Sequence, residues 1–201
     1  CKKNLRIYRN SVLESGQNAG DQGKGAPPLM NYAEIKKRDI ANGTGVRVSL
    51  FVSGCTHRCK GCFNEVAWDF SYGKVFDENT WELIFSYLEP DYIAGLSLLG
   101  GEPFEKSNQR ALLPFLREYK KRFPKKDIWC YTGYTLDRDL VKGGAAYCEC
   151  TDEMLAYTDT LVDGEFIEEL KDISLKFRGS SNQRIIEKPS DFLKSQAKIT
   201  E

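Results

Sequence analysis

The sequence predicts an α/β fold in which parallel strands are joined by helices. Short apolar runs alternate with segments of helical periodicity, which is the pattern of repeated strand–helix–strand units with right-handed crossovers. The apolar runs are nearly continuous rather than interrupted by polar residues, so we expect the strands to be buried on both faces. A glycine- or cysteine-rich motif also follows each of the main runs, where the strands would end.

The expected strands are short and apolar, and they cover residues 46–52, 95–99, 127–131 and 159–162, with a further strand at 174–177. The expected helices lie between them, at residues 78–88, 112–122 and 151–156. Asp77 is suited to cap the first helix, because its carboxylate can accept a hydrogen bond from a free backbone N–H. Pro114 is tolerated near the start of a helix but would kink its interior, which fits a helix that begins at residue 112.

The chain of 201 residues is long enough for one domain with a sizeable core. Residues 15–28 are rich in Gly, Gln, Asn and Pro and have no helical or strand period. We therefore expect residues 1–29 to be a flexible leader or linker, or an artefact of the gene boundaries, with Met30 as a plausible start. Residues 30–187 then form the folded domain, and residues 188–201 form a C-terminal tail.

Composition excludes several classes of protein. Lys+Arg and Asp+Glu number 29 each, so there is no net basic field of the kind that binds nucleic acid. No apolar run approaches the roughly 18 residues that a membrane span requires, and no apolar signal segment follows the basic N-terminus. Seven cysteines, an odd number with tight spacing, argue against a disulfide framework and favour a reducing, cytoplasmic setting.

Unusual motifs follow four of the expected strands. In chain order they are CTHRCKGC (55–62), GGEP (100–103), TGY (132–134) and DGEF (163–166). All four fall at the carboxyl ends of strands, which is where active sites assemble in barrels and in open α/β sheets. We therefore expect these four loops to form one site.

The first motif offers three cysteines, Cys55, Cys59 and Cys62, within eight residues. A [4Fe–4S] cluster normally takes four thiolates, so three would leave one iron open to a small molecule. The alternative is a zinc site in which His57 supplies a fourth ligand, as part of a non-enzymatic interaction module. Four ligands in one short loop are unusual for zinc, so His57 is read as an ordinary loop residue.

The other motifs are weaker by themselves. GGEP is a turn in which Gly100 and Gly101 can bring bare backbone against a ligand. TGY and DGEF are read either as strand-end turns or as functional loops, and Asp163 either as structural or as a group that orients a ribose or a partner. Cys130 lies within a strand and is expected to be a small buried hydrophobe.

The ordered set of motifs resembles the radical S-adenosylmethionine superfamily, and within it the activating enzymes of glycyl radical enzymes. The sequence is most similar to the activases of anaerobic (class III) ribonucleoside-triphosphate reductases over roughly residues 30–186. The motifs that carry this resemblance are NGTGVR (42–47), VSGCTHRCKGCFN (52–64), LSLLGGEPFE (96–105), DIWCYTGY (127–134), LVDGEF (161–166) and RGSSNQ (178–183).

The resemblance implies a small, incomplete (β/α) barrel of radical-SAM type, with parallel strands inside and helices outside. It implies that Cys55, Cys59 and Cys62 bind a [4Fe–4S] cluster whose fourth iron is chelated by S-adenosyl-L-methionine. Reductive cleavage of this cofactor would then yield a 5′-deoxyadenosyl radical. The implied cofactor-binding residues flank the cluster, with the first group near the adenine and the second holding the methionyl amino group: Gly61, Cys62 and Phe63; and Gly100, Gly101, Glu102 and Pro103.

The implied partner is the catalytic subunit of anaerobic ribonucleotide reductase, on which a glycyl radical is generated. Reduced flavodoxin or a similar protein is the implied electron donor. Two alternatives stay open within the superfamily: activation of another glycyl radical enzyme such as pyruvate formate-lyase, and modification of a small molecule. A contact between Arg178 and the protein substrate is a further hypothesis.

Overall fold

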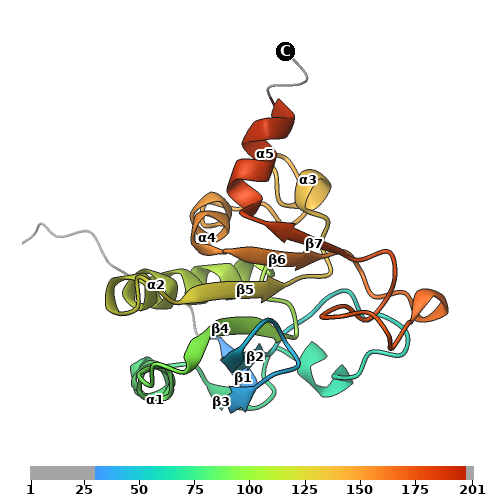
Figure 1. The fold of residues 1–201 in the computed structure, drawn as a ribbon. Coiled ribbons are helices and arrows are strands. Elements are labelled where there is room, and N and C mark those ends of the chain that lie inside the picture. The colour runs from blue at the N-terminus through green and yellow to red at the C-terminus, as the bar shows by residue number, and fades with distance from the viewer. Residues whose placement is uncertain (1–29, 198–201) are drawn as a thin grey trace, which may run out of the picture.

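The computed structural model describes residues 30–197, and these form a seven-stranded mixed sheet with helices α1, α2 and α4 packed on one face (Figure 1). The predicted leader, residues 1–29, lies outside the described residues, as do residues 198–201. In chain order the strands are β1 (Asn31–Asp39), β2 (Val46–Val52), β3 (Lys74–Val75), β4 (Ile93–Gly100), β5 (Asp127–Tyr131), β6 (Thr160–Asp163) and β7 (Arg184–Glu187). The helices are α1 (Glu78–Leu88), α2 (Lys106–Arg122), α3 (Leu136–Asp139), α4 (Thr151–Tyr157) and α5 (Pro189–Ala197), with 3-10 helices η1 (Glu65–Trp68) and η2 (Glu168–Leu170).

The sheet is parallel at its centre and antiparallel at both edges. Its strand order is β3-β1-β2-β4-β5-β6-β7, and the pairs β2–β4, β4–β5 and β5–β6 are parallel. These four strands are the predicted ones, confirmed to within two residues. The antiparallel strands β1, β3 and β7 were not expected, because most of their residues are exposed or half-buried and they therefore lack the continuous apolar runs of the centre. The fold class is thus mixed α/β rather than purely parallel.

Two of the three predicted helices agree with the structure, and the third begins earlier. Helix α1 has its predicted bounds, and Asp77 Oδ1 accepts a hydrogen bond from Thr80 N at 2.9 Å, which confirms the N-cap. Helix α2 begins at Lys106 rather than at residue 112, so Pro114 lies in its interior. The first turns were missed because Asn108 and Gln109 are buried although they are polar, which interrupts the apolar period.

The strand predicted at residues 174–177 is wrong, since this segment is a loop. Asp172 Oδ1 accepts hydrogen bonds from both the backbone N–H and the hydroxyl of Ser174, at 2.8 Å and 2.6 Å, which forms a tight turn. Phe177 has φ +59°, a left-handed conformation that a strand cannot contain. Its ring instead packs edge-on against Trp129 at 5.1 Å between centroids.

The two faces of the sheet differ in chemistry. The face under α1, α2 and α4 is apolar and includes the fully buried Cys130, as predicted. On the other face Arg47, which is 0% exposed, donates to Ser97 Oγ at 2.8 Å and pairs with Asp127 Oδ1 at 2.8 Å. Arg47 Nη1 also donates to Thr44 O at 3.1 Å, so the NGTGVR element is fastened to the sheet. The side chain of Arg47 on β2 therefore links this strand to β4 through Ser97 and to β5 through Asp127.

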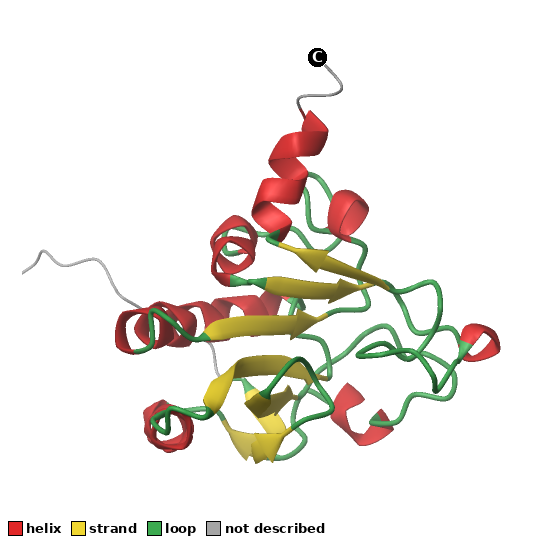
Figure 2. Ribbon diagram, in the orientation of Figure 1, coloured by secondary structure: helices red, strands yellow, loops and turns green. Residues whose placement is uncertain are grey.

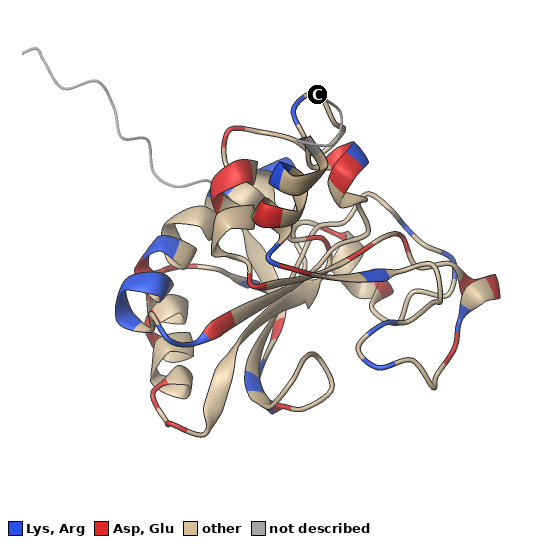
Figure 3. Cartoon of the chain, turned by 45° about the horizontal axis from the view of Figure 1, so that its top comes forward, with Lys and Arg blue, Asp and Glu red and all other residues tan. Residues whose placement is uncertain are grey.

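Charges lie mainly on the helices and loops, while the central strands are largely free of them (Figure 3). Both signs are interspersed in this view, in keeping with the balanced composition. Among the described residues, no helix combines the length and the hydropathy that crossing a bilayer would require.

Candidate active site

The predicted loops gather at one edge of the sheet, beyond the carboxyl ends of the parallel strands (Figure 2). The cysteine loop and the GGEP loop continue the pairing of β2 with β4 past the strand ends. Gly101 N donates to Val52 O at 2.7 Å, and Glu102 N donates to Gly54 O at 2.8 Å. An added Cβ at Gly101 would lie 2.6 Å from Gly54 O, so only glycine permits this approach.

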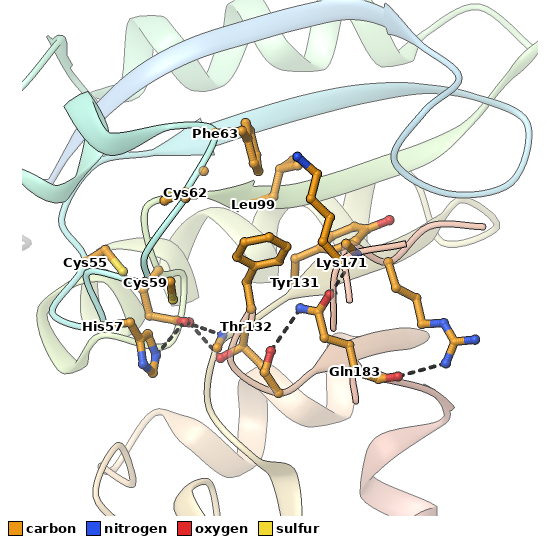
Figure 4. A pocket seen from close by; sticks show the side chains of 18 of the residues that line it. Cys55, His57, Cys59, Cys62, Phe63, Leu99, Tyr131, Thr132, Lys171 and Gln183 are labelled. Atoms are coloured by element: carbon orange, nitrogen blue, oxygen red, sulfur yellow. Dashed lines mark hydrogen bonds and ion pairs between the residues drawn. The ribbon is translucent and has the colours of Figure 1, made fainter. Parts of the chain in front are cut away.

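A cavity of about 530 Å³ opens at this edge, within the size range of cofactor sites. Figure 4 shows Cys55, Cys59 and His57 on one side of it, and Lys171 and Gln183 on the other. Residues of all four predicted motifs line the cavity, which confirms that the four loops form one site. We call residues 53–63 with 100–105 the cysteine wall, and residues 164–183 the loop wall.

The three cysteines line the cavity together. Burial raises the pKa of Cys55 to about 12, with a further contribution from the charge of Glu102, and burial raises the pKa of Cys59 to about 11. Thiols in such surroundings need a strong positive partner to ionise, and a metal cluster supplies one. Asn64 N donates to Cys62 Sγ at 3.4 Å, a contact of the kind that tunes an iron–sulfur centre.

The position of His57 does not support the zinc alternative. Its Nε2 lies 3.2 Å from Glu102 Oε2, so this nitrogen faces a carboxylate. Thiolates of a cubane bind different irons, so they stand farther apart than the ligands of one zinc ion. The donor set of three thiolates around an open cavity therefore fits a cluster better than a zinc ion.

Glu102 is the most enclosed charged group of the site, with 1% of its surface exposed. Its Oε1 accepts hydrogen bonds from Phe104 N and Thr132 Oγ1, both at 2.8 Å, and its Oε2 accepts from Gly133 N at 2.7 Å. Burial lowers the pKa of His57, but its contact with Glu102 outweighs this and the net pKa lies above 6.5. One buried carboxylate thus connects the cysteine loop, the GGEP loop and the TGY loop.

Most of the predicted cofactor residues are brought together. Six of the seven line the cavity: Gly61, Cys62, Phe63, Gly100, Gly101 and Glu102. Phe63 is 82% exposed, which leaves its ring free to cover a ligand. Pro103 is buried behind the loop and does not line the cavity.

Some residues of the DGEF and RGSSNQ motifs stabilise the fold, and others belong to the site. Asp163 is fully buried and pairs with Arg184 at 2.5 Å between Oδ2 and Nη2, and it accepts from Leu136 N at 2.8 Å, so it is structural. Gly164 lines the cavity. Gln183 organises the loop wall, because its Oε1 accepts from Gly179 N at 2.8 Å and its Nε2 donates to Gly164 O at 2.9 Å.

Some contributors were missed by sequence reasoning. Asn108 Nδ2 donates to Ser53 O at 3.0 Å and to Glu102 O at 2.9 Å, which fastens the two loops of the cysteine wall to each other. Glu105 accepts hydrogen bonds from Thr56 N and Oγ1 at 2.8 Å and 2.5 Å. The signal that could have found them is a cluster of polar residues directly after GGEP, where the start of a helix was not expected.

The fold and the cavity define an α/β protein in which three cysteines line one cavity at the carboxyl edge of the parallel strands. In agreement, residues 41–186 match the family model of the 4Fe–4S single cluster domain. The chain belongs to the family of anaerobic ribonucleoside-triphosphate reductase-activating proteins. It is therefore an activating enzyme with a [4Fe–4S] cluster, and S-adenosylmethionine is the cofactor typical of its family.

Curated relatives support this membership along almost their whole length. The anaerobic ribonucleoside-triphosphate reductase-activating protein of Haemophilus influenzae is 47% identical over 158 residues, which are 78% of this chain and 97% of the relative. The corresponding protein of Pasteurella multocida is 43% identical over 78% of this chain and 96% of its own. That of Escherichia coli K12 is 40% identical, covering 77% and 96% respectively.

Proposed function

We propose that this protein activates an anaerobic ribonucleoside-triphosphate reductase by generating a glycyl radical on its catalytic subunit. The observation that carries the proposal is the placement of Cys55, Cys59 and Cys62 together on one side of an open cavity, at the carboxyl edge of the parallel strands. The similarity to activating proteins over nearly their full length supports the choice of partner.

Different residues of the cysteine wall bind the cluster and the cofactor. The three cysteines hold three irons, and the bare backbone of Gly100 and Gly101 forms a floor for the amino-acid part of the cofactor. The exposed ring of Phe63 covers the adenine. When bound, the cluster supplies the electron for reductive cleavage of S-adenosylmethionine, which is coupled to removal of a hydrogen atom from a glycine Cα of the partner.

The shape of the chain suits a protein substrate. The sheet ends at the strands β3 and β7, and we read it as an incomplete barrel of radical-SAM type whose open side the partner covers. The loop wall presents apolar side chains near the cavity, including Ile173, which is 95% exposed. A macromolecular partner would bury this surface and exclude water from the site.

The test is a radical assay in the absence of oxygen. Reconstituted and reduced protein, mixed with S-adenosylmethionine and the reductase catalytic subunit, should give the doublet EPR signal of a glycyl radical. A reductase in which the target glycine is replaced by alanine is the control and should give none. A doublet with pyruvate formate-lyase but not with the reductase would overturn the choice of partner, and a colourless protein with stoichiometric zinc would overturn the enzyme itself.

Arg178 is the first candidate for contact with the protein substrate. It lines the cavity, and its Nη1 donates to Gln183 O at 2.9 Å, which holds the guanidinium in place. Arg178→Ala should lower the yield of glycyl radical while cofactor cleavage without the partner stays unchanged. An unaltered radical yield would remove Arg178 from the interface.

The remaining parts of the proposal rest on the sequence. We assign the activase domain to residues 30–187, so deletion of residues 1–29 should leave cofactor cleavage intact. A site that depends on free thiols and on a reducing electron needs a reducing compartment, and we propose the cytoplasm. Reduced flavodoxin or a similar protein is the proposed donor of that electron.

A further inference from the structure

His57, the only histidine of the chain, occupies a specific place in the site. It lies between Cys55 and Cys59, its side chain is 14% exposed, and its Nε2 faces Glu102 Oε2 at 3.2 Å. Its ring lies against that of Tyr134, with 4.4 Å between centroids. His57 is thus enclosed by a carboxylate and an aromatic ring that come from two other loops.

Glu102 in turn has little capacity left for a ligand. Both of its oxygens are engaged by groups of this chain: Thr132, Gly133 and Phe104 donate to them, and His57 lies within pairing distance. A carboxylate that is enclosed in this way is held rigidly and transmits the position of one loop to another. The Glu102 carboxylate is therefore engaged in contacts that hold neighbouring loops together, and it has little capacity left to bind a ligand.

Glu102 joins the two parts of the site that a bound cofactor would contact at the same time. The cysteine loop carries the cluster ligands, and the floor of Gly100 and Gly101 directly precedes Glu102 in the chain. The backbone bond from Glu102 N to Gly54 O at 2.8 Å fixes only the beginning of the cysteine loop. The contact with His57 fixes the loop farther along, on the segment between the first two cysteines.

We infer that His57 is a positioning residue, which sets the cluster loop against the cofactor floor through the ion-pair contact of its Nε2 with Glu102 Oε2, 3.2 Å apart. Glu102 acts by holding His57, Thr132 and Gly133, and not as a direct ligand of the cofactor's amino group. This inference rests on the proposed function, since it concerns the geometry between the cluster and the S-adenosylmethionine. Loss of the contact between His57 and Glu102 leaves the three cysteine ligands of the cluster in place. It should therefore weaken binding of the cofactor more than it affects retention of the cluster.

Two variants of His57 separate the N–H donor from the ring. His57→Phe keeps a ring to pack against Tyr134 and removes the donor, whereas His57→Gln keeps a donor and removes the ring. After anaerobic reconstitution we expect all proteins to retain similar iron and sulfide. The Kd for S-adenosylmethionine should rise about tenfold in His57→Phe and stay within about threefold of the original in His57→Gln.

The EPR spectrum of the reduced cluster provides a readout that a merely structural role would not move. Addition of S-adenosylmethionine should shift the spectrum of the unaltered protein and of His57→Gln, and should give a smaller or heterogeneous shift in His57→Phe. Arg110→Gln is the control, because it breaks an exposed ion pair with Glu149, at 2.7 Å, on helix α2 and should change neither readout.

Three outcomes are decisive. Equal affinity in His57→Phe and the unaltered protein would overturn the inference, as would His57→Gln binding as weakly as His57→Phe. Tighter binding in His57→Phe would also overturn it, because a released Glu102 would then be the better ligand. If the unaltered protein neither holds a cluster nor binds S-adenosylmethionine, it is the proposed function that fails.

Discussion

The cysteine wall and the loop wall face each other across one cavity, but they are attached to the molecule differently. The cysteine wall is bonded to the ends of β2 and β4 and to the buried side chain of Asn108, and its Glu102 accepts a hydrogen bond from Thr132 of the neighbouring loop. The loop wall is held mostly by its own bonds, such as Ser181 N to Leu170 O at 2.9 Å, and by Gln183. The ring of Phe177 also packs against Trp129 of the sheet.

This difference in attachment indicates that the two walls have different functions. Chemistry at a cluster requires fixed distances, and the wall that carries the cysteines is the one continuous with the rigid sheet. The wall fastened mainly to itself can adjust when a large partner docks, and it carries the more exposed apolar side chains, such as Ile173. Four measurements test this comparison.

Removal of a cluster ligand should have the largest effect. Cys59→Ala leaves two thiolates, so we expect loss of most iron and sulfide and loss of S-adenosylmethionine cleavage, measured by metal analysis and by product chromatography. Cys130→Ala is the matched control, because this thiol is buried in the apolar core away from the cavity. Normal iron content in Cys59→Ala would contradict the assignment of the ligand.

Glycine substitutions should separate the two walls. In Gly101→Ala the new Cβ would meet Gly54 O at 2.6 Å and Ala67 O at 2.9 Å, and we expect about 2 kcal/mol of destabilisation with weaker cofactor binding. In Gly164→Ala no atom lies closer than 3.6 Å, so only the left-handed φ of +103° opposes the change, at about 1 kcal/mol. Denaturant unfolding of both variants measures this difference, and equal losses would argue against it.

The region around Asp159, at the other end of the strands, serves as a reference for stability effects away from both walls. Asp159 accepts from Lys120 Nζ at 2.8 Å and from Ile128 N at 2.9 Å, and it also pairs with Lys188. Burial alone would raise its pKa, but these partners outweigh it, so the pKa lies below 3.8. A depressed carboxylate pKa stabilises the fold above the unfolded-state value, and this contribution is lost as the pH falls through the folded-state value.

Asp159→Asn should therefore cost about 1 kcal/mol at neutral pH and progressively less below pH 3.8. Thermal unfolding of the variant and of the unaltered protein at several pH values measures this destabilisation. The substitution leaves the cofactor site intact. Constant destabilisation across this range would show that the carboxylate charge is not what holds this end of the sheet.

The smallest global effect is expected for Gln183→Ala in the loop wall. The variant loses the bonds to Gly179 and Gly164, so amides of residues 165–182 should exchange faster while the melting temperature falls by only a few degrees. Amides around the cysteine loop should keep their protection. If both walls lost protection together, they would form one cooperative unit and the comparison would fail.

Much of the fold and part of the site could be predicted from the sequence. The central strands were predicted because burial on both faces demands continuous apolar runs, and the motif after each strand then had to share one edge. The antiparallel strands β1 and β7 could not be predicted in this way, since many of their residues are polar and exposed. The loop at residues 174–177 resembled a strand because local composition does not reveal the left-handed turn at Phe177.

The sequence alone was sufficient to predict three cysteines at short spacing, a pair of glycines after a strand, and the four strands that present these loops. Only the tertiary structure decided which polar groups meet across these loops. His57 finds Glu102 forty-five residues away, Asn108 ties Ser53 to Glu102, and Asp163 turns to Arg184 rather than to the cavity. The physical reason is that spacing along a chain fixes local ligand sets, whereas the partner of a buried polar group depends on which segments the sheet places side by side.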